Sequence, residues 1–456
     1  MESGKLRLLA LLPILASLIL LYFDFFPQSY RSNCSLIQYR HFWIASKRIV
    51  TPTSIISGAV EVRGGKIKSI VEGDEWRGKL PSSQVIDYGE AVVIPGLVDV
   101  HAHLDDPGRS EWEGFPSGTR AAAAGGITTL IDMPLNSYPS TVSEETLKLK
   151  TKAAKGRIFV DVGFWGGLVP ENAFNATALD RLLQAGALGL KSFMCPSGIN
   201  DFPMTNSSHI KRPLLVHAEI QQEANDDLEI QENTANPRSY STYLKTRPAS
   251  WEEAAIRELV TVTKDTRAGG PAEGAHLHTV HLADSGSSLQ LIKEAKSSGD
   301  SITVETCPHY LAFSAEQIPD GDTRFKCSPP IRDADNKEKL WSALLFVLPV
   351  TWSYGLKYGI SLNQLVSWWS EKPAKLAGQD LKGAIVTGNY ADIAVWEPEV
   401  EFQLDDNHPV YLKHRNISAY MGSKLRGKVL ATFVRGNLVY QDGKHARVAC
   451  GVPILA

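Results

Sequence analysis

Apolar and polar positions divide this chain into two β-rich ends and a long middle of a different character. At both ends, apolar and polar residues alternate in short runs, which is typical of half-buried strands. The Gly64-Gly65 and Gly436-Asn437 pairs lie between such runs and predict hairpin turns. We expect the two ends to pair into one small β-sandwich domain, made of residues 40–95 and 385–450.

The middle, residues 96–380, alternates short apolar runs with helical patterns, which predicts a parallel α/β sheet. Seven runs are interpreted as strands, at residues 92–103, 126–134, 158–166, 187–194, 213–219, 276–284 and 301–311. Helical patterns between them lie at residues 116–126, 143–155, 250–265 and 287–299. We expect a (β/α)8 TIM-type barrel. That fold needs an eighth strand, and the pattern does not supply one.

The first 30 residues have another composition. Lys5 and Arg7 precede an apolar run that is broken only by Pro13 and Asp24. This pattern predicts a signal or signal-anchor segment at residues 1–30, with the anchor favoured, and so a possible membrane anchor. We expect the protein in the endoplasmic reticulum or secretory pathway. Sequons compatible with that lumen occur at Asn33, Asn175, Asn206 and Asn416.

Charge and cysteine content narrow the classes of function. The net charge is -3 and there is no basic stripe, so nucleic acid is not expected as a partner. The five cysteines include no CxxC pair, which predicts neither a zinc ribbon nor a disulfide framework. We expect mostly free thiols.

Candidate metal ligands follow the predicted strands. His101 and His103 alternate at the end of the first strand and therefore share a face, together with Asp99. Lys191 lies inside the fourth apolar run, where an unpaired ammonium is costly. Further histidines come late in the fifth and sixth runs, at His217 and His281. The carboxyl ends of barrel strands meet at one mouth, so these side chains are expected to converge.

Each of these residues has an ordinary explanation when taken alone. A His-x-His pair or a single histidine is often part of a core or surface, and a lysine at a strand end often extends its amine to water. Five candidates at strand ends, in barrel order, are much harder to explain by coincidence. The remaining histidines, His276, His278 and His309 among them, are interpreted as ordinary.

The chain resembles the cyclic amidohydrolases, the family of dihydroorotases, dihydropyrimidinases and allantoinases. The resemblance runs from about Phe42 to the carboxyl terminus and rests on "PGLVDVHAHLDDPGR", "GLKSFM", "LLVHAE", "HTVHLAD", "ETCPHYL" and "KCSPPIRD", in the family's order. Within the family, plant-type allantoinases are the most similar group. Dihydroorotases carry an arginine where this chain has Asp105, so dihydroorotate is disfavoured as a substrate.

The resemblance implies hydrolytic opening of the allantoin ring to allantoate, with allantoin as the small-molecule partner. It implies two zinc ions, Zn²⁺, that activate water for attack on the ring carbonyl. One ion would be bound by His101 and His103 and the other by His217 and His281, with carbamylated Lys191 as the bridge. Asn136 and the backbone around Ser328 would contact the ring. A homo-oligomer is expected.

One part of the family pattern is missing. The family places a metal-binding, proton-shuttling aspartate at the end of the eighth strand, and no such residue follows "KCSPPIRD". The family's flanking helices join near Leu344-Leu345, so the catalytic aspartate is absent. A substitute strand over "LLFVLPVTW" is disfavoured by Pro349. We therefore expect an incomplete barrel and an impaired or inactive form. The alternatives are dihydropyrimidinase or hydantoinase activity, or a non-catalytic, partner-binding variant.

Overall fold

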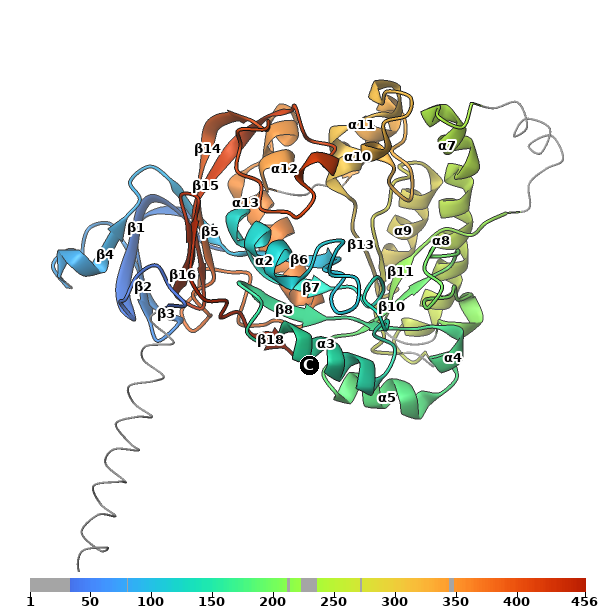
Figure 1. Ribbon diagram of the computed structural model, residues 1–456, viewed down its shortest axis with the longest axis horizontal. Coiled ribbons are helices and arrows are strands. Elements are labelled where there is room, and N and C mark those ends of the chain that lie inside the picture. Colours follow the sequence, from blue (N-terminus) through green and yellow to red (C-terminus); the bar gives the residue numbers. More distant parts are fainter. Residues whose placement is uncertain (1–32, 80, 211–213, 223–235, 271–272, 344–347) are drawn as a thin grey trace, which may run out of the picture.

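The computed structural model describes residues 33–79, 81–210, 214–222, 236–270, 273–343 and 348–456 (Figure 1). The predicted signal segment, residues 1–30, lies outside the described residues. Among the residues that are described, no helix is long and apolar enough to cross a membrane.

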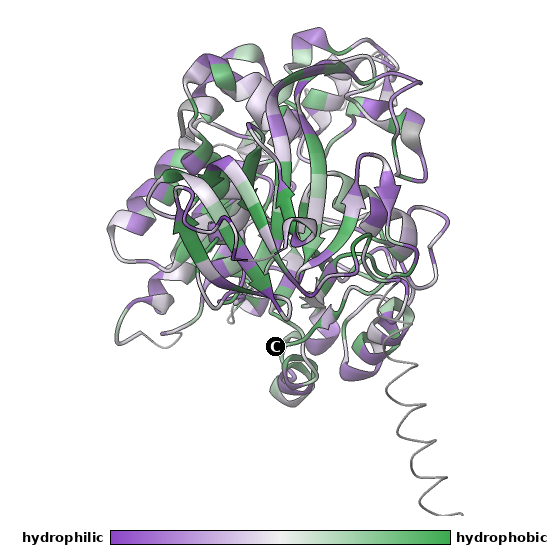
Figure 2. Cartoon of the chain, turned by 90° about the vertical axis from the view of Figure 1, so that its left-hand side faces the viewer, coloured by the Kyte–Doolittle hydropathy of each residue, from purple (hydrophilic) through white to green (hydrophobic). Residues whose placement is uncertain are grey.

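The two chain ends meet in one nine-stranded sheet, as the alternating pattern predicts. Its spatial order is β17-β16-β15-β14-β5-β1-β2-β3, and β4 pairs with β1. The strands are β1 (His41–Val50), β2 (Ile55–Arg63), β3 (Lys66–Glu72), β4 (Val85–Asp87), β5 (Val92–Pro95), β14 (Ile393–Gln403), β15 (Lys424–Val434), β16 (Asn437–Gln441) and β17 (Lys444–His445). The amino-terminal and carboxyl-terminal parts join where β5 pairs antiparallel with β14. Figure 2, turned toward this sheet, shows hydrophobic stretches along its central strands.

Each of the seven runs predicted as strands contributes a barrel strand, although the first does so only over its second half. These strands are β6 (Leu97–Ala102), β7 (Ile127–Asp132), β8 (Asp161–Phe164) with its continuation β9 (Gly166–Gly167), β10 (Leu190–Phe193), β11 (Leu214–His217), β12 (Leu277–Thr279) and β13 (Ile302–Val304). Each pairs parallel with its neighbour, in the sheets β6-β7-β8 and β9-β10-β11-β12-β13. A short terminal strand, β18 (Pro453–Ile454), pairs with β8. The architecture is that of a parallel α/β barrel beside a β domain built from both chain ends.

Helices occupy the predicted positions between the strands (Figure 1). Those of the barrel are α2 (Phe115–Ala124), α3 (Glu144–Ala154), α4 (Pro170–Ala173), α5 (Ala176–Gln184), α7 (Tyr240–Thr246), α8 (Ala249–Thr263), α9 (Ser287–Ser297) and α10 (Pro308–Ala312). After them come α11 (Ala334–Ala343), α12 (Leu348–Gly355), α13 (Leu362–Val366), the π-helix η7 (Ser367–Glu371) and α14 (Lys372–Leu376). Helix α3 shows how the sequence sets such bounds, because the Ser143 side chain accepts a hydrogen bond from Thr146 N and caps the first turn.

The apolar run predicted as a single strand over 92–103 is divided at Gly96. Residues before the glycine form β5 in the end sheet, and residues after it form β6 in the barrel. A Cβ atom at Gly96 would lie 2.2 Å from the Thr128 side chain, so only glycine permits this approach. One residue therefore separates the two sheets at this crossing.

In the described part of the chain, no strand lies between β13 and β6 to close the barrel. The substitute-strand alternative is wrong for the residues that are described, because 348–355 form helix α12. Pro349 lies in the first turn of that helix, where its missing N–H costs nothing. Helix α12 packs on the end sheet: Arg426 N donates to Ser353 Oγ at 2.7 Å. The join at Leu344-Leu345 falls outside the described residues.

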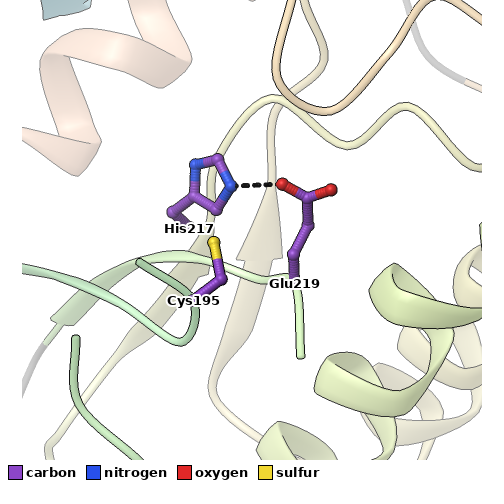
Figure 3. Close-up of side chains that lie close together, drawn as sticks. All are labelled: Cys195, His217 and Glu219. Atoms are coloured by element: carbon purple, nitrogen blue, oxygen red, sulfur yellow. Dashed lines mark hydrogen bonds and ion pairs between the residues drawn. The ribbon is translucent and has the colours of Figure 1, made fainter. Parts of the chain in front are cut away.

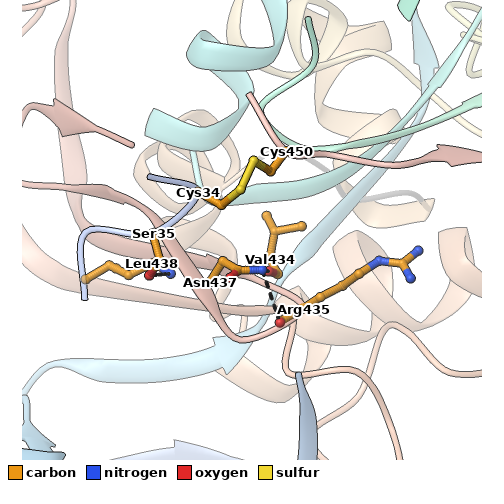
Figure 4. Close-up of a disulfide and its surroundings, with 7 residues drawn as sticks. All are labelled: Cys34, Ser35, Val434, Arg435, Asn437, Leu438 and Cys450. Atoms are coloured by element: carbon orange, nitrogen blue, oxygen red, sulfur yellow. Dashed lines mark hydrogen bonds between the residues drawn. A yellow bond between two sulfur atoms is a disulfide. The ribbon is translucent and has the colours of Figure 1, made fainter. Parts of the chain in front are cut away.

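Two cysteines depart from the expectation of free thiols. Cys34 and Cys450 form a disulfide, with their Cα atoms 5.5 Å apart (Figure 4). The other three, Cys195, Cys307 and Cys327, are free. The sequence gives no spacing signal for a bridge between residues 416 positions apart, because only the meeting of the two chain ends brings them together.

Candidate metal centre

The five predicted ligands converge at the carboxyl ends of the barrel strands. The ring centroid of His101 lies 5.5 Å from that of His103 and 5.3 Å from that of His281. The rings of His217 and His281 are 4.5 Å apart. Phe193 connects the lysine to this group: its ring lies 4.5 Å from Lys191 Nζ and stacks on His217, also at 4.5 Å.

Lys191 carries a buried amine that makes no hydrogen bond to the described part of the chain. The residue is 0% exposed, and its Nζ atom contacts no acceptor among the described residues. Burial lowers the pKa of Lys191 to about 7, and the nearby Glu305 carboxylate acts in the opposite direction. An amine of this kind is neutral in a large fraction of molecules at neutral pH, and neutral amines are nucleophiles and ligands.

Three of the histidines are held in the neutral form. Burial, and then neighbouring positive groups that include Lys191, lower the pKa values of His103, His217 and His281 well below the ordinary value. The Nδ1 atom of His281 is buried and has no partner in the described part of the structure. Neutral imidazoles with free nitrogen atoms are the form that binds metal ions, so this donor set fits a metal centre.

Two carboxylates beside the histidines were not predicted from the sequence. Glu305, directly after β13, lies 2.5 Å from His101 Nδ1 through Oε1. Burial raises the pKa of Glu305, but His101 and the hydrogen bonds from His101 and His278 outweigh it and bring this pKa well below the ordinary value. Glu305 belongs to the "ETCPHYL" stretch of the sequence, and only the fold reveals its contact with His101.

The second carboxylate is Glu219, two residues after β11. Its Oε2 atom lies 2.6 Å from His217 Nε2 (Figure 3). The same atom lies 2.5 Å from Arg247 Nη1. Cys195 completes a buried group in which one ligand atom of each residue lies within 4.8 Å of the others. This arrangement leaves Nδ1 of His217 as the nitrogen not bonded to Glu219.

The two residues predicted to contact the ring are placed differently. Ser328 lines the cavity beside the histidines, and its Oγ donates to Glu219 Oε2 at 3.3 Å. Asn136 lies outside the lining of this cavity and hydrogen-bonds to the side chain of Asp105. Its backbone has a φ of 70°, the left-handed region that asparagine tolerates better than most residues.

A cavity of about 1130 Å³ lies where an eighth strand would close the barrel. It is bounded by residues of β6 on one side and of β12 and β13 on the other, with Trp368 and Trp369 also in its lining. Among the described lining residues, only Asp99 and Glu305 are carboxylates. Asp99 accepts from the His101 backbone N at 2.9 Å, and Glu305 is bonded to the His101 ring.

Comparison with known proteins agrees with this arrangement. Family models match residues 37–91 (allantoinase, composite domain), 90–284 (dihydro-orotase-like) and 342–439 (amidohydrolase family). The solved L-hydantoinase from Arthrobacter aurescens superposes with a TM-score of 0.81 at 25% identity, covering 92% of this chain and 100% of that one. The D-hydantoinase from Bacillus sp. AR9 gives 0.75 at 26% identity, covering 90% and 98%. The fold and site define a metal-dependent cyclic amidohydrolase.

Sequence relatives narrow the class. An allantoinase from Arabidopsis thaliana is 62% identical over 97% of both chains. A probable allantoinase from Oryza sativa is 58% identical over 100% of this chain and 99% of its own length. The chain belongs to the allantoinase family.

Proposed function

We propose that this chain is built to open the ring of allantoin to allantoate at a centre of two zinc ions. The observation that carries the proposal is the convergence of four histidines on a buried lysine whose amine has no partner among the described residues. The 62% identity to a plant allantoinase supports allantoin as the substrate.

In this proposal His101 and His103 would hold one zinc ion, His217 and His281 would hold the other, and Lys191, modified to a carbamate, would supply oxygen ligands to both. The lowered pKa of Lys191, about 7, supports the modification. The neutral amine attacks CO2, a C–N bond forms, and one proton leaves, which gives a carboxylate with two oxygen atoms. Bound zinc would supply polarisation of the ring carbonyl and a lowered pKa of water.

We propose further that this form is impaired, because it lacks the segment that carries the eighth strand and its aspartate. The cavity between β6 and β13 supports this proposal. So do the alignments, which run over 494 positions with the Arabidopsis relative and 510 with the Oryza relative. Both alignments are longer than this chain of 456 residues. The relatives therefore contain residues that have no counterpart in this chain. Loss of general acid–base catalysis typically costs about 10²–10⁴-fold in rate.

The alternative functions have less support. The hydantoinases match at 25–26% identity, far below the plant allantoinases, so a hydantoinase or dihydropyrimidinase activity is not favoured. A non-catalytic, partner-binding variant would be expected to lose its ligands, whereas all five candidates persist here. Ser328, at the cavity wall, has more support as a substrate contact than Asn136.

We infer a location in the endoplasmic reticulum or secretory pathway. The disulfide between Cys34 and Cys450 supports it, because such bonds persist in oxidising compartments. A homo-oligomer, which size-exclusion chromatography with light scattering would detect, stays a prediction.

The test compares this chain with a version in which the corresponding segment of the Arabidopsis relative is inserted between Leu344 and Leu345. Both are loaded with zinc and bicarbonate, assayed for allantoin opening, and analysed for metal. We expect zinc in both proteins and turnover about 10²–10⁴-fold higher in the restored one. Equal turnover would refute the impairment. Absence of zinc and activity from both would refute the proposed function.

A further inference from the structure

A row of hydrogen-bonded side chains leads across three strands to the first candidate ligand. Thr303 Oγ1, on β13, lies 2.7 Å from His278 Nδ1, on β12. His278 Nε2 lies 3.3 Å from Glu305 Oε2, and Glu305 Oε1 lies 2.5 Å from His101 Nδ1, on β6. The row spans the side on which the described strands leave the barrel open.

The two oxygen atoms of Glu305 have different partners, so the carboxylate is held from both sides. His278 is 4% exposed and cannot move aside into solvent. The Glu305 side chain is 16% exposed and that of His101 17% exposed, so water competes little for their hydrogen bond. The sequence pattern predicted no special role for His278. In the structure its ring lies between Thr303 and Glu305 and hydrogen-bonds to both.

The contact selects one nitrogen of His101. An ionised carboxylate only accepts hydrogen bonds, so Nδ1 of His101 carries the proton and donates it to Glu305. In the neutral ring the lone pair then belongs to Nε2. The ring edge that carries Nε2 is the one left for a metal ion, while the opposite edge is fixed to β13.

We propose that Glu305 is a positioning residue of the metal centre, which fixes the orientation and tautomer of His101 with His278 as its support. This inference rests on the proposed two-zinc function. Outer partners of ligating histidines typically contribute 10–100-fold to metal affinity. Glu305 itself contacts neither metal nor substrate in this role.

The test measures zinc affinity by chelator competition in the full chain, with the variants Glu305→Ala and Glu305→Gln. We expect the alanine variant to bind zinc about 10–100-fold more weakly than the wild type. The glutamine variant should lose less, because its amide oxygen still accepts from Nδ1–H of His101. Thermal unfolding of the metal-free proteins controls for folding.

A second readout needs no metal. Histidine ¹⁵N shifts of the metal-free chain, with His101 assigned through His101→Asn, should report a proton on Nδ1 in the wild type and a mixture of tautomers in Glu305→Ala. The matched control is Glu252→Gln, which alters a buried carboxylate that pairs with Arg332 instead of a histidine. Its zinc affinity should stay within twofold of the wild type.

The outcomes separate this inference from the function on which it rests. Wild-type chain that binds no zinc overturns both. Wild-type chain that binds zinc, with Glu305→Ala folded, equal in affinity and unchanged in tautomer, overturns the role of Glu305 alone. If the alanine variant does not fold, Glu305→Met decides, because its side chain fills similar space and its thioether accepts hydrogen bonds only weakly: an affinity equal to that of the wild type, together with an equal tautomer population, rejects the proposal.

Discussion

Lys191 shows how burial gives a single side chain its chemistry. The sequence predicts its place in an apolar strand, and the five ligand candidates can all be found from strand-end positions. The carboxylates Glu305 and Glu219 could not be found in this way, because their partners lie on other strands or depend on a side-chain direction. Residue-level prediction therefore finds ligands more readily than the groups that orient them.

The lowered pKa of Lys191 makes the stability of the metal-free chain depend on pH. The unfolded chain binds this proton up to about pH 10.4, whereas the folded chain releases it above about 7, so stability rises with pH between these values. We expect wild type to gain up to about 1.4 kcal/mol per pH unit relative to Lys191→Met in this window. Urea unfolding in CO2-free buffer measures it. A difference that stays constant from pH 7 to 9 contradicts the prediction.

At the scale of elements, a buried ion network ties the barrel to the end sheet. Lys382 Nζ lies 2.8 Å from Asp161 Oδ2, on β8, and 2.5 Å from Asp392 Oδ2, just before β14. Arg435, after β15, donates from Nε to Asp161 at 2.7 Å. The Lys382 and Asp161 side chains are 2% and 0% exposed. Four charges from separate segments thus meet between the two domains.

Removing the lysine from this network leaves two buried carboxylates with too little positive charge. We expect Lys382→Met to lower the free energy of unfolding by about 3–5 kcal/mol. The control is Lys357→Met, whose pair with Glu338 is 58% and 51% exposed and is expected to contribute about 1 kcal/mol or less. Chemical denaturation compares them. If both variants lose the same free energy of unfolding, the buried network stabilises the fold no more than the exposed pair does, and the prediction is wrong.

Elements were predicted well where hydrophobic period and turn residues agree, as in the Gly64-Gly65 hairpin and helices α2, α3, α8 and α9. The run at 92–103 was wrong as a single strand, because its division at Gly96 depends on the approach of Thr128. The segment 348–355 is apolar enough for either a strand or a helix. In the structure this segment is a helix that packs against β15. The segment's own sequence does not show which element it will pack against, so it does not distinguish a helix from a strand.

At the scale of the whole molecule, the disulfide links the first described residues to the segment between β17 and β18. Cys34 and Cys450 are 416 positions apart, so the bond closes nearly the entire chain into one loop. Their meeting depends on the complete fold, which is why composition and spacing did not predict it.

Opening this loop should destabilise the protein without touching the site. We expect Cys450→Ser to lower the free energy of unfolding by about 2–5 kcal/mol. Cys327→Ser, at a free cysteine, is the control and should change it little. Thermal or urea unfolding under non-reducing conditions gives both values. Mass analysis of the wild type should find one disulfide and three thiols. A Cys450→Ser protein as stable as the control would contradict the expectation.

Gly96, the single residue between β5 and β6, bears on when during synthesis the strand that carries His101 is fully anchored. Gly96 joins β5 directly to β6, which carries His101, and β5 acquires its neighbour β14 only when residues 393–396 have been made. A nascent chain that stops short of that point has its first histidine pair on a strand whose anchor is incomplete. The proposed metal centre would therefore gain a fully anchored β6 only late in synthesis, once residues 393–396 can pair with β5.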